Sequence, residues 1–190
     1  MIFKQFFDAD SSTLTYFLAD ADSKEAVLID PVDSQMNVYR NLLASENFVL
    51  KYSLETHVHA DHVTASGQLR NETSAQTGVG KACGAEAANL QLKEGDQINF
   101  GRYTIHVIAT PGHTVGSVSY LCKNRLFTGD ALLINGCGRT DFQGGDAGTL
   151  FDSITKKIFS MPDETLIYPG HDYNNKRVSC VSQEKLINPR

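Results

Sequence analysis

The hydrophobic pattern in the first third of the chain is typical of short strands. The runs 13–18 and 25–29 are rich in β-branched, aromatic and aliphatic residues, and the polar segment 20–23 between them predicts a turn. Pro31 ends the second run, because proline cannot donate a hydrogen bond to a sheet. The pattern therefore predicts two strands joined by a short turn.

A helix is expected next. Ser34 is a suitable N-cap, and Val38, Leu42 and Leu43 would lie on one face of the helix that follows it. The segment 48–54 is strand-like again. The order strand, helix, strand indicates a crossover unit whose sheet is buried against helices.

Four further runs are expected to be strands. Residues 104–109 alternate between apolar and polar, and the runs 117–122 and 125–128 flank the dipeptide 123–124 as the two arms of a hairpin. A last strand is expected at 165–168. Many strands with few helices indicate an α/β or α+β fold.

A glycine-rich loop separates the hairpin from the last strand. Six of the 15 glycines lie within 129–148, and a long loop of this kind on a rigid scaffold is typical of a functional site. Asp146 is expected to cap a following helix whose inner face carries Leu150, Ile154 and Ile158.

Composition narrows the class of protein. A chain of 190 residues with 41% hydrophobic and 21% charged residues predicts one globular domain over 1–190. No apolar run exceeds four residues, which argues against a membrane partner, and a net charge of -5 argues against nucleic acid. The four cysteines form no C-x-x-C pair, and no secretory signal is visible, so we expect reduced thiols and a cytoplasmic location.

The strongest chemical signal is the segment 56–62, which follows a predicted strand. It holds four potential metal ligands within six residues: His57, His59, Asp61 and His62. In an extended segment His57 and His59 point the same way, because side chains alternate with period two. A metal site is therefore expected here.

Three more ligand-type residues follow predicted strands. His113 lies on a Pro-Gly turn, Asp130 follows the second arm of the hairpin, and His171 follows a final Pro-Gly pair. Loops at the ends of adjacent strands converge, so these groups are expected to meet in one cleft. His106 lies inside an alternating strand and is expected to be a structural or surface residue.

Ligation by nitrogen and oxygen alone suits zinc, iron or manganese, and does not suit a structural cysteine-rich zinc site. Two histidines and one carboxylate would form the facial triad of non-haem Fe(II) oxygenases. All seven candidates together would instead form a two-metal hydrolase. The spacing alone leaves both arrangements open.

The H-x-H-x-D-H element, followed by His113, Asp130 and His171 in this order, resembles the metallo-β-lactamase superfamily over nearly the whole chain. The resemblance implies an αββα sandwich, in which two mixed β-sheets are flanked by helices and the metal lies at one edge. Family members commonly continue past the segment that matches 188–190.

Two subfamilies remain to be separated. The stretch 136–139 is shared with glyoxalase II, the hydroxyacylglutathione hydrolase. The stretches 56–63, 129–143 and 168–173 closely resemble the persulfide dioxygenases, also called sulfur dioxygenases. Glyoxalase II usually has a more aromatic run after its arginine, and its C-terminal helical region grips glutathione, whereas only 19 residues follow His171.

The resemblance to persulfide dioxygenases implies oxidation of glutathione persulfide by O₂ to sulfite and glutathione, at one Fe(II) per chain. It implies that the residues matching His57, His113 and Asp130 hold the iron. It also implies that four further residues stay near the metal without holding a second ion: His59, Asp61, His62 and His171.

Two side chains are candidates for binding the substrate. Arg139 offers a rigid fork for a glutathione carboxylate, and the alternative is that it only orders the loop. Tyr173 offers a hydroxyl to the tripeptide. Cys137 is expected to be a packed structural thiol.

Two other functions stay open at this stage. A dinuclear thioester hydrolase would hold two Zn, Fe or Mn ions, and a metal-binding sensor would hold metal without turnover. The expected partners are glutathione persulfide and O₂, and a homodimer is the assembly to be tested. A mitochondrial matrix location is the alternative for a processed eukaryotic chain.

Overall fold

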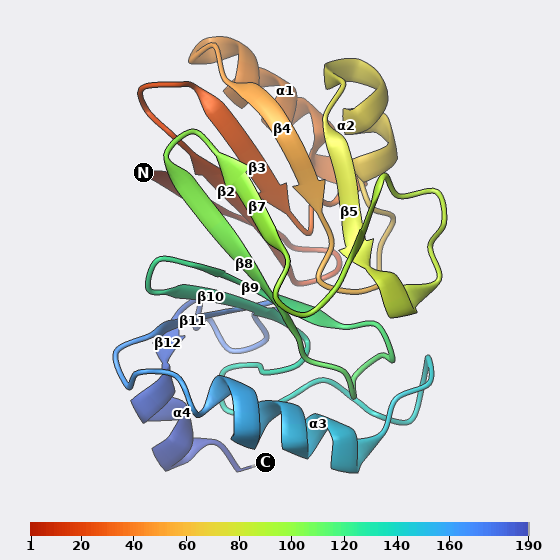
Figure 1. Ribbon diagram of the computed structural model, residues 1–190, viewed down its shortest axis with the longest axis vertical. Coiled ribbons are helices and arrows are strands. Elements are labelled where there is room, and N and C mark those ends of the chain that lie inside the picture. Colours follow the sequence, from red (N-terminus) through yellow and green to blue (C-terminus); the bar gives the residue numbers. More distant parts are fainter. Residues whose placement is uncertain (190) are drawn as a thin grey trace.

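The computed structural model describes residues 1–189 and has two β-sheets packed face to face between two layers of helices (Figure 1). The first sheet, in spatial order, contains β1 (Ile2–Asp8), β2 (Thr13–Ala19), β3 (Glu25–Ile29), β4 (Val49–Leu54), β5 (Gln76–Gly80) and β6 (Leu90–Leu92). The second, in the order β12-β11-β10-β9-β8-β7, contains β7 (Gln97–Phe100), β8 (Tyr103–Ala109), β9 (Val118–Cys122), β10 (Arg125–Gly129), β11 (Leu166–Pro169) and β12 (Ser179–Cys180).

Both sheets are mixed. Strands β3 to β6 run parallel to one another, as do β10 and β11, and the remaining neighbours are antiparallel. Helices α1 (Met36–Ser45) and α2 (Ser66–Thr73) lie on one side of the sandwich, and α3 (Ala147–Ser153) and α4 (Val181–Ile187) on the other (Figure 1). The predicted αββα sandwich is confirmed. None of the helices within residues 1–189 has both the length and the apolar character needed to span a bilayer.

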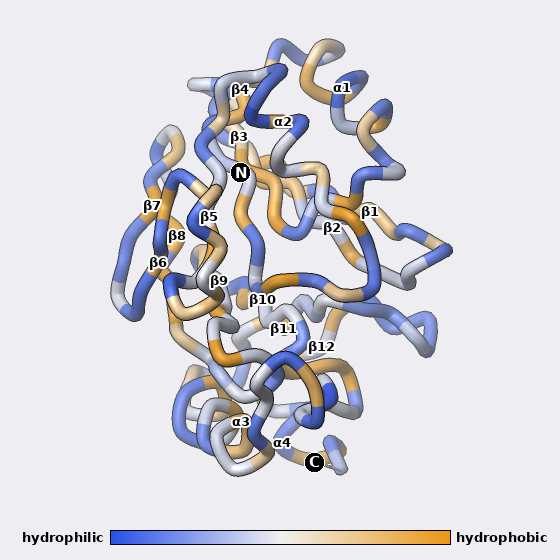
Figure 2. Tube along the Cα trace, turned by 90° about the vertical axis from the view of Figure 1, so that its right-hand side faces the viewer, coloured by the Kyte–Doolittle hydropathy of each residue, from blue (hydrophilic) through white to orange (hydrophobic). Residues whose placement is uncertain are grey.

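The two faces of β2 explain why its seven residues are all buried. Leu14, Tyr16 and Leu18 point toward the second sheet and join the core between the sheets. Phe17 and Ala19 point the other way and join the core under α1. Side chains alternate along a strand, so a strand covered on both faces is buried throughout. Figure 2 shows hydrophobic stretches along these strands, while outer loops are largely hydrophilic.

Most predicted elements are confirmed within a residue or two, including the parallel pair β3–β4 joined by α1. Lys123, with φ 56°, lies in the turn between β9 and β10. Asp146 caps α3 by accepting the backbone N–H of Thr149 (2.7 Å), and Leu150, Ile154 and Ile158 are buried. His106 on β8 is exposed, as expected of a surface residue.

The predicted start of α1 was wrong. The hydroxyl of Ser34 donates to Oδ1 of Asp8 (2.7 Å), and a single 3₁₀ turn over Asp33–Gln35 precedes the helix. Of the residues predicted for the buried face, Leu42 and Leu43 are buried, whereas Val38 is 45% exposed. Tyr39 takes the buried position instead.

Two buried tyrosines connect the sheets at the strand ends. Tyr16 on β2 donates its hydroxyl to the carbonyl of Pro169 at the end of β11 (2.5 Å). Tyr120 on β9 donates to the carbonyl of Glu55 just after β4 (2.7 Å). Burial raises the pKa of both hydroxyls well above the usual range, so both remain donors. Each bond fixes the backbone shortly before a predicted site residue, which is His171 in one case and His57 in the other.

We predict that Tyr120→Phe lowers the free energy of unfolding by about 1–3 kcal/mol, because it leaves the buried carbonyl of Glu55 without its donor. Chemical denaturation of the two proteins measures this difference. Tyr52→Phe is the matched control, since Tyr52 packs against the same core cluster but its hydroxyl has no hydrogen-bond partner within residues 1–189. Equal losses in both variants would contradict the role given to the Tyr120 hydroxyl.

Candidate metal centre

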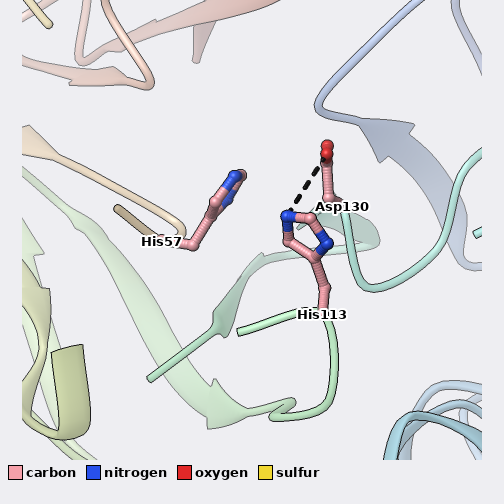
Figure 3. A group of neighbouring side chains, drawn as sticks. All are labelled: His57, His113 and Asp130. Atoms are coloured by element: carbon pink, nitrogen blue, oxygen red, sulfur yellow. Dashed lines mark ion pairs between the residues drawn. The ribbon is translucent and has the colours of Figure 1, made fainter. Parts of the chain in front are cut away.

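Three of the predicted ligands meet where strands from both sheets end. His57 follows β4, His113 follows β8 and Asp130 follows β10. All three are buried, and their ligand atoms lie within 4.8 Å of one another. Figure 3 shows the three side chains converging, with Nε2 of His113 3.6 Å from Oδ2 of Asp130.

Hydrogen bonds on the far side of each ring orient the two histidines. The hydroxyl of Thr56 donates to Asp30, so its oxygen accepts from Nδ1 of His57 (3.0 Å). Nδ1 of His113 donates to the carbonyl of Arg139 (2.7 Å). These bonds place the proton on Nδ1 in both rings and leave the Nε2 lone pair available, which is the usual arrangement of a metal-binding histidine.

The residues of this group fit a transition-metal ion. Oδ1 of Asp130 is buried without a hydrogen-bond partner within residues 1–189, and a buried carboxylate oxygen normally has one. Burial, together with the neighbouring histidines, lowers the pKa of His57 well below its usual range, so the ring is neutral as a ligand must be. Two imidazoles and one carboxylate suit iron, zinc or manganese.

The other predicted ligands lie beside this group. Ligand atoms of His59, Asp61 and His62 form a second set within 4.8 Å of one another. Nε2 of His171 lies 3.7 Å from Oδ2 of Asp61 and 3.5 Å from Oδ1 of Asp130, between the two sets. Seven ligand-type residues thus share one region.

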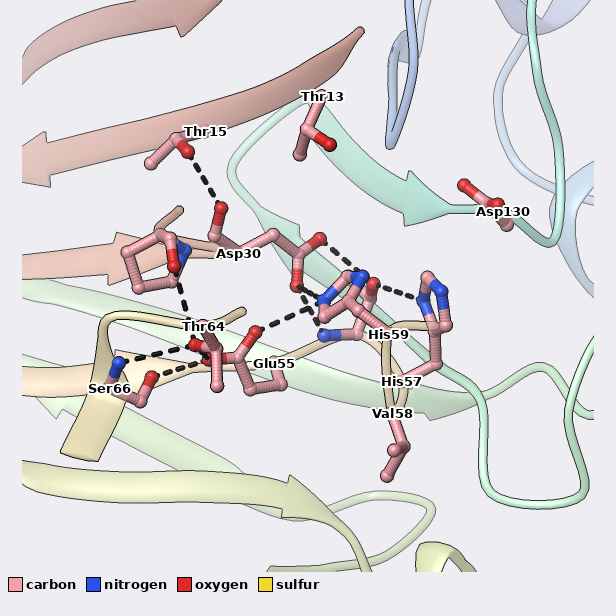
Figure 4. A network of polar contacts seen from close by, with 12 residues as sticks. Thr13, Thr15, Asp30, Glu55, His57, Val58, His59, Thr64, Ser66 and Asp130 are labelled. Atoms are coloured by element: carbon pink, nitrogen blue, oxygen red, sulfur yellow. Dashed lines mark hydrogen bonds and ion pairs between the residues drawn. The ribbon is translucent and has the colours of Figure 1, made fainter. Parts of the chain in front are cut away.

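His59 contacts two carboxylates that are not among the site residues predicted from the sequence. Its Nε2 lies 3.2 Å from Oδ1 of Asp30 and 3.1 Å from Oε2 of Glu55 (Figure 4). Burial lowers the pKa of His59, but these carboxylates outweigh burial and raise the pKa well above its usual range. Glu55 also accepts hydrogen bonds from the hydroxyls of Thr64 and Ser66.

Both missed residues carry a recognisable signal. Asp30 directly follows the apolar run 26–29, and Glu55 lies at the end of β4, next to the histidine-rich segment. Asp130 was identified as a candidate ligand because it follows a predicted strand. The same argument applies to Asp30 and Glu55.

A cavity of about 410 Å³ opens onto the candidate ligands. Arg139 and Tyr173 both line it, and the apolar side chains of Leu133 and Phe142 contribute to its wall. The Tyr173 ring stacks on His171, with ring centroids 5.3 Å apart. The structure therefore brings both predicted substrate-binding residues to the cavity that contains the candidate ligands.

Comparison with known proteins gives three results. The family model described as the metallo-beta-lactamase superfamily matches residues 9–171. The mitochondrial persulfide dioxygenase ETHE1 of Mus musculus is 46% identical over 193 residues, spanning 100% of this chain and 76% of the mouse protein. The crystal structure of ETHE1 from Myxococcus xanthus superimposes with a TM-score of 0.97 at 50% identity, covering 100% of this chain and 84% of that one.

A relative with a different function is less similar to this chain in sequence. The hydroxyacylglutathione hydrolase of Hamiltonella defensa is 36% identical over 163 residues, which span 85% of this chain and 63% of the hydrolase. Both the sequence identity and the share of the two chains that is aligned are therefore higher for the dioxygenase than for the hydrolase.

We predict that Gly138→Ala weakens metal binding roughly ten- to a hundred-fold, the range seen when groups that orient a ligand are disturbed. An added Cβ would lie 2.6 Å from Nδ1 of His113 and 2.5 Å from the carbonyl oxygen of Asp130, so both candidate ligands must move. Chelator competition with elemental analysis measures the affinity. Gly136→Ala is the matched control in the same loop, because its Cβ would meet nothing within 4 Å. Wild-type affinity in the Gly138 variant would show that this contact does not position the ligands.

Proposed function

The chain belongs to the persulfide dioxygenase family of the metallo-β-lactamase superfamily, and from that membership we propose that it is a non-haem Fe(II) enzyme that oxidises glutathione persulfide. The observation that carries the proposal is the buried group of two histidines and one aspartate, within a chain that matches a persulfide dioxygenase along its whole length. Such a ligand set leaves coordination positions open for a substrate and O₂.

The reaction balances with one water molecule. Glutathione persulfide, O₂ and water give glutathione, sulfite and two protons. The outer sulfur loses four electrons, which reduce O₂ completely, and the sulfur–sulfur bond breaks with the electron pair and a proton going to glutathione. Iron, when bound, supplies the one-electron chemistry that O₂ requires.

The proposed ligands are His57, His113 and Asp130, and the proposed binding residues act around them. Arg139 binds a substrate carboxylate through its guanidinium, and Tyr173 offers its hydroxyl to the peptide part of the substrate. Both line the cavity, in which Phe142 helps to exclude water from the bound persulfide.

The polar residues outside the proposed ligand set hold and move protons. His171 lies between the carboxylates of Asp61 and Asp130, within 3.7 Å of each, so it can stabilise their charge while the substrate is bound. His62 shares a hydrogen bond of 3.0 Å with Asp61. The two protons released with sulfite have acceptors in this group.

The second candidate function is a dinuclear thioester hydrolase. The observation that favours it is the second set of ligand-type residues, His59, Asp61 and His62, which two-metal hydrolases would use. Zn, Fe or Mn could then occupy both positions. Lower identity to the hydrolase relative makes this the weaker candidate.

The cellular setting is also a proposal. The mouse relative is named a mitochondrial protein, which supports the mitochondrial matrix for a eukaryotic chain, and the cytoplasm is our proposal otherwise. A homodimer remains a prediction, which sedimentation of the purified protein tests.

We predict that the iron-loaded protein consumes O₂ in the presence of glutathione persulfide and releases sulfite in a 1:1 ratio to O₂. Removing the metal with a chelator should abolish both signals, and Fe(II) should restore them, whereas Zn(II) should not, because zinc has no redox chemistry. An oxygen electrode combined with a sulfite assay makes the measurement. Cleavage of lactoylglutathione without any oxidation of the persulfide would favour the hydrolase instead.

A further inference from the structure

Arg139, which lines the site cavity, forms an exposed ion pair with Asp141. Nε of Arg139 lies 2.7 Å from Oδ1 of Asp141, and Nη2 lies 2.9 Å from Oδ2, so the pair is bidentate. The two side chains are 66% and 71% exposed. The guanidinium also lies over the Phe142 ring, 5.8 Å from its centroid. Exposed pairs contribute little to folding stability, so stability alone gives no reason for this geometry.

The backbone ties this pair to the candidate metal centre. The carbonyl of Arg139 accepts the Nδ1 proton of His113, one of the proposed ligands (2.7 Å). The backbone of Arg139 is therefore fixed relative to the centre, and Arg139 lines the cavity that the proposed ligands share. A substrate whose sulfur lies at the centre would extend past this pair.

The pair retains free hydrogen-bonding capacity of both signs. Asp141 occupies only the Nε and Nη2 donors of Arg139, and Nη1 has no acceptor within residues 1–189. Each oxygen of Asp141 accepts one N–H from Arg139 and keeps a further lone pair. The free edge of the guanidinium can bind a carboxylate of a ligand, and the carboxylate of Asp141 beside it can bind an ammonium. The ion pair is therefore complementary to a ligand that carries a carboxylate and an ammonium on the same carbon atom.

Glutathione carries such a zwitterionic group at one end only. Its γ-glutamyl residue has an α-carboxylate and an α-ammonium on the same carbon, whereas its glycine end has a carboxylate alone. The two ends therefore differ in the charge pattern that this ion pair can recognise.

We propose that Arg139 and Asp141 together bind the α-amino-acid group of the γ-glutamyl end, with the α-carboxylate on Arg139 and the α-ammonium on Asp141. This inference rests on the proposed function and adds the part of the substrate that is recognised. Asp141 is then a specificity-determining residue, which selects glutathione persulfide over persulfides that lack the ammonium. The hydrogen bonds from Arg139 lower the pKa of Asp141 to about 2, which keeps its carboxylate charged during turnover.

The test compares two substrates in four proteins. The substrates are glutathione persulfide and its des-amino analogue, in which a glutaryl group replaces the γ-glutamyl residue. The proteins are wild type, Asp141→Asn, Arg139→Ala and the control Asp163→Asn. Asp163 forms an exposed ion pair with Lys185 (2.7 Å) before β11 begins, whereas the site residue His171 follows the end of that strand.

Wild type and the control should prefer glutathione persulfide by roughly three- to ten-fold in kcat/KM, the range for one exposed charged hydrogen bond. In Asp141→Asn this preference should disappear because kcat/KM for glutathione persulfide falls, while kcat/KM for the des-amino analogue stays the same. Arg139→Ala should lower kcat/KM for both substrates, because both retain the α-carboxylate.

An equal loss on both substrates in Asp141→Asn would overturn the proposal, because it would mean that Asp141 only positions Arg139. An unchanged preference would also overturn it. If wild type forms no sulfite from either persulfide, the proposed function fails, and calorimetric binding of glutathione and des-amino glutathione tests the ion pair separately. In that case tighter binding of glutathione that disappears in Asp141→Asn supports the recognition, and equal binding of both compounds refutes it.

Discussion

The buried carboxylate of Asp30 is the constraint on which the candidate centre depends. It is fully buried at the end of β3, and a charge in that position is very costly unless it is hydrogen-bonded. Asp30 accepts the backbone N–H of Thr56 (2.7 Å) and its hydroxyl (2.8 Å), and it lies 3.2 Å from His59. The same Thr56 oxygen accepts from His57. The orientation of His57, the first candidate ligand, therefore depends on one charge next to the neighbouring strand β3.

The second constraint is the close approach of strand ends from the two sheets. Gly129, with φ +50°, lies so close to Thr56 that an added Cβ would be 2.3 Å from the Thr56 hydroxyl oxygen. A Cβ on Gly170 would lie 2.4 Å from Oδ1 of Asp130. Only glycine permits these contacts, and through them loops from β4, β10 and β11 converge. Buried tyrosine hydroxyls hold the same strand ends from the opposite sheet.

An element is predictable from the sequence when its hydrophobic pattern lies within the element itself, and less so when its position depends on a distant partner. Strands buried on both faces, such as β3 with its apolar run 26–29, have a clear local signal and were predicted well. The edge strand β1 was missed because its residues are mostly half-buried and mix apolar with polar types. The start of α1 was misplaced because Ser34 bonds to Asp8, a distant partner that a local pattern does not reveal.

The candidate ligands His57, His113 and Asp130 were predictable because each lies within four residues of the end of a strand. Spacing alone did not divide the ligand-type residues into groups, because the division depends on ring orientation, which hydrogen bonds to Thr56 and Arg139 determine. The family resemblance supplied the expected division. The pairing of Arg139 with Asp141 was also out of reach, since residues two apart in a loop have no fixed geometry. Family resemblance added the chemistry that spacing left open.

Metal stoichiometry shows whether His57, His113 and Asp130 hold one iron, as we propose. Elemental analysis of wild type, His62→Ala and His171→Ala, each purified without added metal, gives the number of ions per chain. We expect close to one iron in all three proteins, because neither His62 nor His171 belongs to the proposed ligand set. About two metals in wild type, falling toward one in both variants, would contradict the mononuclear centre and with it the dioxygenase chemistry.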